Sequence, residues 1–196
     1  MLRMGPLPLR GRPVRIIAGE WRRRLLQAPP GEVTRPTADR TRETLFAMLT
    51  SRLGSFEGLA VADLFAGSGA LGLEALSRGA ATCLFAENEP AAIRALRANI
   101  ANLRAQQRCD VRAVSVMSLG PAKEPLDLIL LDPPYGSGAG VVALDRLQRH
   151  GWIGEATWVA LETAHEEKVH TKALVPEAER KVGKAKLTLL RLAGRA

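Results

Sequence analysis

The sequence is poor in cysteine, histidine and aromatic residues, and these scarcities exclude several classes of protein. Its 196 residues include 2 cysteines, 3 histidines and 1 tyrosine. Cys83 and Cys109 lack CxxC spacing and nearby histidines, so we expect reduced thiols and no metal site. No apolar run approaches the roughly 20 residues that span a bilayer, and the first dozen residues lack the apolar stretch of a signal peptide. We therefore expect a cytoplasmic protein that does not insert into membranes.

Acidic residues are scarce in the first fifth of the chain. Residues 1 to 42 contain ten arginines and only three acidic residues, a balance of +7, whereas the remaining 154 residues have a balance of +1. Such a concentration of positive charge indicates a surface for a polyanion, with a solvated basic tail as the alternative. The stretch VRIIAGEWRRRLLQAP, residues 14 to 29, predicts two short strands around Ala-Gly-Glu.

Apolar periodicity predicts alternating strands and helices after residue 37. Helices are expected from about residue 37 and over 70–79, 89–105 and 140–151, strands over 59–65, 81–87, 109–116, 126–131 and 157–163, and a final hairpin around residue 183. This order favours an α/β, Rossmann-like fold with a mainly parallel twisted sheet, helices on both faces and a C-terminal antiparallel hairpin. We expect residues 1–50 to form a basic hairpin and helix extension that binds a polyanion, and residues 51–196 to form the main domain.

Glycines follow the first strand of this sheet. Gly67, Gly69 and Gly72 satisfy the spacing G-x-G-x-x-G at a helix start, where a backbone without side chains lets a ligand approach. Glu87 follows 20 residues after Gly67, at the end of the next strand, as expected for an acceptor of ribose hydroxyls. The pattern fits a nicotinamide dinucleotide or S-adenosylmethionine, with a tight turn that binds nothing as the alternative.

Asp63 distinguishes between these two cofactors. Its carboxylate ends the first strand beside the glycines, where it would repel a pyrophosphate and attract the ammonium and sulfonium groups of S-adenosylmethionine. A carboxylate that caps the following turn is the other interpretation, and both can hold at once.

The single tyrosine stands in the segment Asp132-Pro133-Pro134-Tyr135, directly after the apolar run LDLILL. The prolines remove two backbone donors, so the segment presents only acceptors, which suits the exocyclic amino group of a base. Holding that amine by both hydrogens, out of conjugation with its ring, makes its lone pair more available. Tyr135 offers a flat face on which a flipped-out base can stack. The alternative is a rigid turn that only ends the strand.

These motifs together resemble a known family. DLFAGSG, Glu87 and DPPY are similar to the amino-methylating, S-adenosylmethionine-dependent Rossmann-fold methyltransferases. The stretches RIIAGEWRRRLL, TRPTADRTRETLFAML and DLFAGSGALGLEALSRGA resemble the bacterial small-subunit (16S) ribosomal RNA guanine-N2 methyltransferases, over about Arg15 to Arg191. The resemblance implies a class I methyltransferase fold, S-adenosylmethionine as cofactor and methyl transfer to the N2 amine of one guanine. The partner would be 16S ribosomal RNA in an assembling small subunit, and the enzyme a monomer.

The resemblance also implies that residues 1–50 are an RNA-binding extension and that residues 51–196 are the S-adenosylmethionine-dependent methyltransferase domain, and it implies roles for individual residues. The guanine would be held by Asp132, Pro133, Pro134 and Tyr135. The cofactor would be bound by Asp63, Gly67, Ser68, Gly69, Glu87, Asn88, Ser115 and Val116. The RNA would be bound by Arg15, Trp21, Arg22, Arg23, Arg24, Arg35, Arg40 and Arg42, with Thr37 and Glu43 near the mouth of the pocket. Ser115 and Val116 depart from the family, which usually has Asn or Asp followed by a small residue at this point.

Other functions fit parts of the pattern. Methylation of adenine N6 in DNA would use the same Asp-Pro-Pro-Tyr chemistry. A nicotinamide-dependent oxidoreductase would explain the glycines and Glu87 but would leave Asp-Pro-Pro-Tyr and the arginines without a role. A noncatalytic RNA-binding module would use the basic hairpin alone and would show salt-sensitive affinity without methyl transfer.

Overall fold

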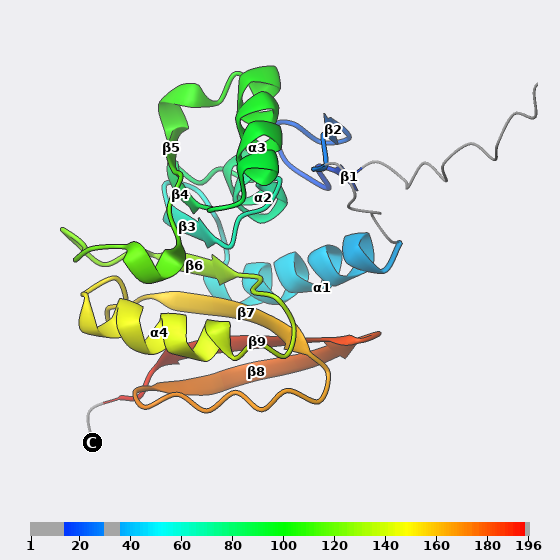
Figure 1. Ribbon diagram of the computed structural model, residues 1–196. Helices are drawn as coiled ribbons and strands as arrows, with labels where there is room; N and C mark the ends of the chain where they lie inside the picture. The colour runs from blue at the N-terminus through cyan, green and yellow to red at the C-terminus, as the bar shows by residue number, and fades with distance from the viewer. Residues whose placement is uncertain (1–13, 30–35, 195–196) are drawn as a thin grey trace, which may run out of the picture.

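One seven-stranded sheet organises the protein in a computed structural model, which describes residues 14–29 and 36–194 (Figure 1). The strand order is β5-β4-β3-β6-β7-β9-β8. The strands of the sheet are β3 (Ala60–Leu64), β4 (Thr82–Ala86), β5 (Cys109–Arg112), β6 (Leu128–Leu131), β7 (Trp158–Ala164), β8 (Leu174–Val182) and β9 (Ala185–Leu192). The helices are α1 (Pro36–Leu53), α2 (Ala70–Ser77), α3 (Pro90–Leu103) and α4 (Ala139–Arg149), with short 3-10 turns η1 (Gln106–Arg108) and η2 (Val116–Ser118).

The centre of the sheet is parallel, as the alternation of strands and helices predicts. Strand β3 pairs with β4 on one side and with β6 on the other, both in parallel. All four residues of β6 are buried, which explains why its sequence is a continuous apolar run and not an alternating one. The chain order reverses between β3 and β6, and ligands in such sheets bind beyond the carboxyl ends of the strands at this reversal.

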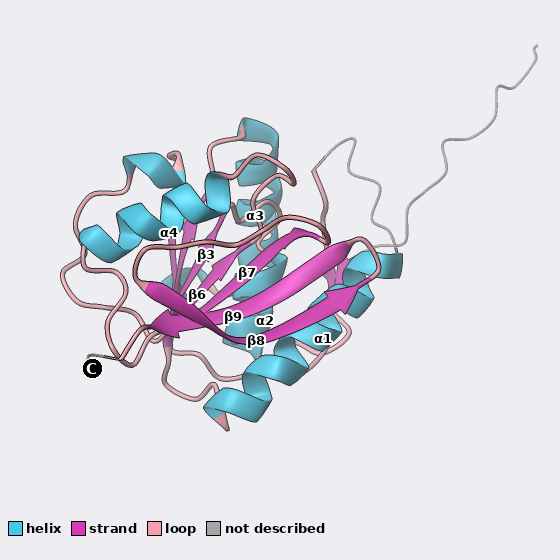
Figure 2. Ribbon diagram, turned by 90° about the horizontal axis from the view of Figure 1, so that it is seen from below, coloured by secondary structure: helices cyan, strands magenta, loops and turns pink. Residues whose placement is uncertain are grey.

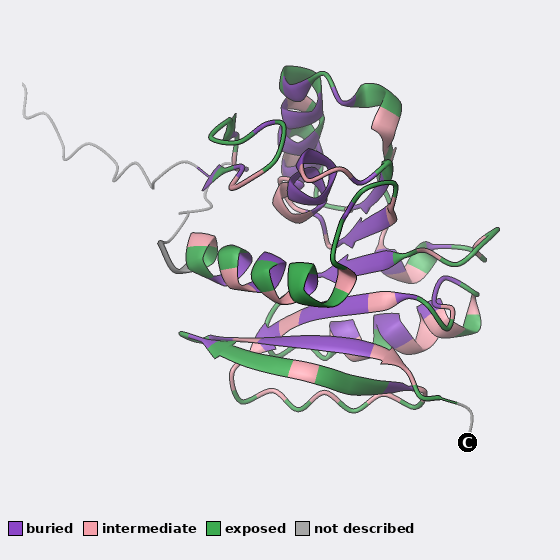
Figure 3. Cartoon of the chain, turned by 180° about the vertical axis from the view of Figure 1, so that it is seen from behind, coloured by how far each residue is buried: buried purple, intermediate pink, exposed green. Residues whose placement is uncertain are grey.

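The C-terminal hairpin is antiparallel and forms one edge of the sheet. Strand β9 pairs with both β7 and β8 in antiparallel fashion, and Gly183 has a φ of 59° between the two hairpin strands. Most of β8 is exposed (Figure 3), and Pro176 lies on it beside a register irregularity. A proline and a bulge are typical of edge strands, because both discourage pairing with another chain.

Helices cover both faces of the sheet. Figure 2 shows α1 and α4 on opposite sides, and the buried side chains form two clusters that correspond to these faces. Helices α1, α2 and α3 contribute to one cluster, which includes Phe46, Leu73 and Leu96. Helix α4 and η2 contribute to the other, which includes Leu144 and Val116. The Rossmann-like fold class predicted from the sequence is therefore confirmed.

The N-terminal segment forms the expected hairpin, with shorter strands than the apolar pattern implies. Strands β1 (Val14–Arg15) and β2 (Leu25–Leu26) are antiparallel. Val14 and Leu26 are buried in the same cluster as α1, α2 and α3, so the hairpin shares the core of the main sheet. Helix α1 runs through the boundary expected at residue 50, and the division of the chain there remains a prediction. No helix in the described part of the chain is long and apolar enough to cross a membrane.

Candidate active site

The two predicted motifs meet at the carboxyl ends of β3 and β6. Strands β3 and β6 pair in register, from Val61 with Leu128 to Leu64 with Leu131. The glycine loop after β3 and Asp132 after β6 therefore lie side by side beyond the ends of these strands. The Asp132 amide lies 3.5 Å from the Leu64 carbonyl oxygen. Beyond them lies a cavity of about 850 Å³. It is lined by Pro29, Asp63, Phe65, Ala66, Gly67, Ser68, Ala70, Leu71, Glu87, Asn88, Glu89, Ala91, Ala92, Asp132, Pro133, Pro134 and Tyr135.

The turn between β3 and α2 requires unusual backbone conformations. Gly67 and Gly69 have φ values of 55° and 82°, and Phe65 adopts a φ of 63° despite its large side chain. A β-carbon on Gly69 would lie 2.3 Å from Leu96 Cδ1, so glycine also permits the close packing of α3. Left-handed backbone at a bulky residue is costly and often marks a functional loop. The turn brings the N-terminus of α2 to the cavity, where its partial positive charge can favour an acceptor group of a ligand.

The position of Asp63 is compatible with both interpretations of its role. It is 1% exposed, and its Oδ2 accepts a hydrogen bond from the Gly72 amide at 2.8 Å, so it does cap the turn. It also lines the cavity. Burial raises the pKa of Asp63 well above its ordinary value, and the charges of Asp132 and Glu87 raise it further. A cationic ligand beside this carboxyl group would offset the cost of ionising it.

Glu87 organises the loop before any ligand arrives. Its Oε2 accepts from the Gly67 amide at 2.8 Å, and its Oε1 accepts from the amides of Asn88 and Glu89, each at 2.8 Å. A carboxylate has about four acceptor positions, so one remains for a hydroxyl of a ligand. The 20-residue spacing from Gly67 therefore reflects a direct contact in the structure.

The Asp-Pro-Pro-Tyr segment is held by the next strand of the sheet. Tyr135 is 49% exposed, and its hydroxyl donates to Glu162 Oε1 on β7 at 2.5 Å. Burial and this hydrogen bond raise the pKa of Tyr135, so its hydroxyl stays protonated and acts as a donor. Pro133 is buried against Gly140, where a β-carbon would lie 3.1 Å from Pro133 Cγ. Asp132 is exposed and faces the cavity from this rigid support.

Sequence reasoning missed several residues of this site. Glu162 follows the buried part of β7. Its position at the carboxyl end of a strand that pairs in parallel with β6 is a signal in the sequence that could have identified it as a residue near the site. Pro29 lines the cavity from the end of the N-terminal hairpin, far away in sequence. Pro29 could not have been identified from spacing, because its position depends on long-range packing of the hairpin.

Ser115 and Val116 are not among the residues that line the cavity. Ser115 Oγ accepts from the Met117 amide at 3.2 Å and caps η2, and Val116 is 4% exposed in the core. Strand β5 ends at Arg112, earlier than the pattern implies, so these residues lie in a turn and not at a strand end. The structure does not bring this pair to the expected cofactor pocket.

The predicted RNA-binding residues fall into two groups. Arg15, Arg22, Arg23, Arg24 and Arg40 are exposed. Trp21 and Arg42 are buried, at 7% and 6% exposure. The Arg42 guanidinium donates to the Arg15 carbonyl oxygen at 2.6 Å, and Arg108 lies 5.2 Å from the Trp21 ring centroid. Arg35 lies outside the described residues.

The fold and this cavity define a Rossmann-like methyltransferase. The reversal of strand order brings together a glycine loop, an acidic residue on the next strand and the Asp-Pro-Pro-Tyr segment. Methyl transfer is the reaction that accounts for all three features. The chain belongs to the family described as Conserved hypothetical protein 95, which matches residues 14–191. The resemblance inferred from the motifs is therefore confirmed at the level of the family.

Individual relatives agree with this assignment. Ribosomal RNA small subunit methyltransferase D of Escherichia coli K12 is 37% identical over 150 residues, covering 76% of this chain and 74% of the relative. The protein of the same name from Haemophilus influenzae is 36% identical over 155 residues, covering 76% and 78%. The solved structure of yhhF from Escherichia coli, described as a candidate methyltransferase, has a TM-score of 0.80 and 33% identity, covering 93% of this chain and 99% of that chain.

Proposed function

We propose that the protein transfers a methyl group from S-adenosylmethionine to the N2 amine of a guanine in 16S ribosomal RNA. The observation that carries the proposal is the placement of Asp132 and Tyr135 across one cavity from the glycine loop. The names of the relatives, which are ribosomal RNA small subunit methyltransferases, support RNA of the small subunit as the substrate. The exposed arginines of the N-terminal hairpin fit the same partner.

The cavity fits the cofactor in size and in charge. Its volume of about 850 Å³ is within the range of small-molecule sites, about 300 to 1,000 Å³. Four carboxyl groups line it, from Asp63, Glu87, Glu89 and Asp132, and among the described lining residues there is no lysine or arginine. This charge suits a ligand with an ammonium and a sulfonium group and opposes a dinucleotide pyrophosphate. S-adenosylmethionine, when bound, supplies an electrophilic methyl group. Glu87 would accept from its ribose, and Asp63 would face its charged methionine end.

The residues after β6 would hold the nucleophile. The Asp132 carboxylate and the carbonyl oxygen of Pro133 are acceptors for the two N–H groups of the guanine amine. Tyr135 supplies a stacking face, and Glu162 fixes that face by accepting from the tyrosine hydroxyl. Positioning the amine in this way activates its lone pair without a strong base. The proton released after transfer goes to Asp132 or to solvent.

Transfer of a labelled methyl group to small ribosomal subunits from cells lacking the protein tests this proposal. We expect Asp132→Asn to bind cofactor and RNA with the affinity of the wild type but to transfer about 10²- to 10³-fold more slowly, the usual loss for a preorganised polar contact to the reacting group. Asp110→Asn, an exposed carboxylate on the edge strand β5, is the matched control and should keep full activity. A normal rate for Asp132→Asn would overturn the assignment of this residue.

A further inference from the structure

A second cavity lies at the N-terminal hairpin, apart from the lining of the first. It has a volume of about 320 Å³ and is lined by Arg15, Ile16, Ile17, Arg22, Arg23 and Glu43. Three arginines and one glutamate therefore line a single cavity. The hairpin provides the arginines, and α1 provides the glutamate.

Among the described residues, no ion pair engages the side chains of these three arginines. Three other arginines in or beside the hairpin have internal partners: Arg78 pairs with Glu74, Arg108 pairs with Glu20, and Arg24 donates to the Asn102 carbonyl oxygen. Among residues 14–29 and 36–194, by contrast, no carboxylate forms an ion pair with Arg15, Arg22 or Arg23, and all three are exposed. Their charges are available to a ligand.

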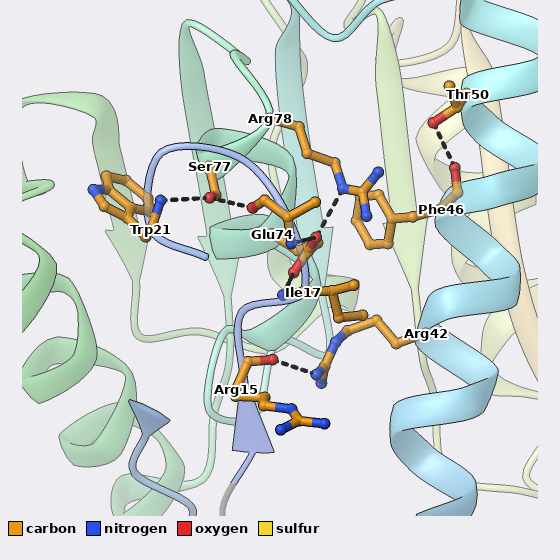
Figure 4. Close-up of polar contacts among 10 residues, drawn as sticks. Arg15, Ile17, Trp21, Arg42, Phe46, Thr50, Glu74, Ser77 and Arg78 are labelled. Atoms are coloured by element: carbon orange, nitrogen blue, oxygen red, sulfur yellow. Dashed lines mark hydrogen bonds and ion pairs between the residues drawn. The ribbon is translucent and has the colours of Figure 1, made fainter. Parts of the chain in front are cut away.

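The walls of this cavity are rigid. The Glu74 side chain is fully buried, and its oxygens accept from the amides of Ile17 at 2.7 Å and Ala18 at 3.1 Å (Figure 4). Ser77 Oγ accepts from the Trp21 amide at 3.0 Å and donates to the Ala18 carbonyl oxygen at 2.6 Å. Arg42 holds the Arg15 carbonyl oxygen, as described above. A frame fixed by buried side chains is what a preorganised binding site requires.

The backbone of Arg23 points to the same conclusion. Its φ is 70°, a conformation that glycine or asparagine adopts with less strain. Its amide donates to the Ile16 carbonyl oxygen at 2.9 Å, and this bond closes the hairpin between two residues that line the cavity. An arginine that occupies a strained position and lines a cavity without an internal partner is a candidate for ligand binding.

We propose that this cavity binds one ribonucleotide of the RNA backbone, with Arg15, Arg22 and Arg23 on the phosphate and Glu43 accepting from the 2′-hydroxyl. The proposal rests on the proposed function for its choice of RNA. Arginine forks match phosphate oxygens, and a carboxylate is an acceptor only, so it needs a donor such as the 2′-hydroxyl. DNA lacks that donor, so Glu43 would distinguish RNA from DNA. The cavity volume is at the small end of ligand sites, as expected for a sugar and phosphate.

The phosphate contact is tested by the salt dependence of RNA binding. Plots of log K against log salt concentration have a negative slope. We expect Arg22→Gln/Arg23→Gln to make this slope shallower by about 0.7, the value for one phosphate on single-stranded RNA. The control Arg180→Gln/Lys181→Gln removes the same charge from two exposed residues of β8 and should leave the slope unchanged. An unchanged slope in the hairpin variant, or an equal fall in the control, would overturn the site.

The role of Glu43 is tested with an RNA oligonucleotide and its 2′-deoxy counterpart. We expect the wild type to prefer RNA by about tenfold, the effect of one hydrogen bond to a charged group. Glu43→Ala should bring the ratio of the two affinities toward one, and an unchanged ratio would contradict the assignment. Binding and methyl transfer are measured separately. A wild type that binds with the expected slope but transfers no methyl group refutes the proposed function and leaves this site standing.

Discussion

The two cavities differ in charge and in construction. The larger one lies at the carboxyl ends of β3 and β6 and is lined by carboxylates from four residues. The smaller one lies under the N-terminal hairpin and is lined by three arginines and one glutamate. The first suits a cationic cofactor, and the second suits a polyanion. Under the two proposals, one chain separates the site for methyl transfer from the surface that binds the RNA backbone.

The two cavities also differ in the contacts that fix their geometry. Apart from Pro29 of the hairpin, the larger cavity is formed mainly by segments that follow paired strands, so most of its geometry comes with the sheet. The smaller one depends on buried side chains of α2 that bind the backbone of the hairpin from 56 or more residues away. Mutations that destabilise the hairpin should therefore lower the affinity for RNA more than the affinity for the cofactor.

Glu74→Gln should separate the two regions most strongly. Breaking a buried pair with Arg78 costs about 3 to 5 kcal/mol in the free energy of unfolding. Because Glu74 also fixes the hairpin, RNA affinity should fall more than cofactor affinity. Denaturant unfolding and two binding titrations measure this, with the exposed Glu124→Gln as control. Equal losses at both sites would show that the regions are not separable.

Glu87→Gln should act on the acidic cavity alone. Losing the charge of the acceptor weakens its contact with a ribose by about 1.5 to 3 kcal/mol, or about 10- to 100-fold in cofactor affinity. RNA affinity should stay at the wild-type value. Calorimetry with S-adenosylmethionine measures the first quantity, and wild-type affinity there would remove Glu87 from the site.

Tyr135→Ala should weaken productive binding of the guanine by about 1 to 3 kcal/mol, since the stacking face is lost. Tyr135→Phe keeps the face and loses only the hydrogen bond to Glu162, so it should retain most of the activity. Steady-state rates for the two variants make the comparison. Equal damage from both would place the role of Tyr135 in its hydroxyl and not in its ring.

Asp63→Asn should have the smallest effect on the stability of the free protein, visible in the pH dependence of that stability. Burial raises the pKa of Asp63 in the folded state, so between its unfolded and folded pKa values the unfolded state binds fewer protons. The free energy of unfolding therefore falls as pH rises from about 4 through that window. Asparagine keeps an acceptor for the Gly72 amide and removes this fall. Parallel unfolding-versus-pH curves for variant and wild type would contradict the assignment.

The sequence predicts the larger cavity better than the smaller one. The glycines, Glu87 and Asp132 each follow a recognisable strand, and parallel pairing places strand ends at one edge, so their convergence could be expected. The exception is Ser115 with Val116, because β5 ends early at Arg112 and the chain turns into η2.

The hairpin shows what local patterns do not contain. Trp21 and Arg42 look like RNA-binding residues in the sequence, yet both are buried. Glu74 and Ser77 look like ordinary residues of α2, and only the folded chain shows that they bind the hairpin backbone. The charge of the segment is readable from composition, but which arginines are available to a ligand depends on contacts between distant elements.

The most direct test of the central claim identifies the product of the larger cavity. Small ribosomal subunits from cells lacking the protein are incubated with the enzyme and S-adenosylmethionine labelled on its methyl group, and the RNA is digested to nucleosides. We predict label in N2-methylguanosine. Label in N6-methyladenosine would keep the chemistry of Asp-Pro-Pro-Tyr and contradict the target, and no label in RNA would contradict the proposed function itself.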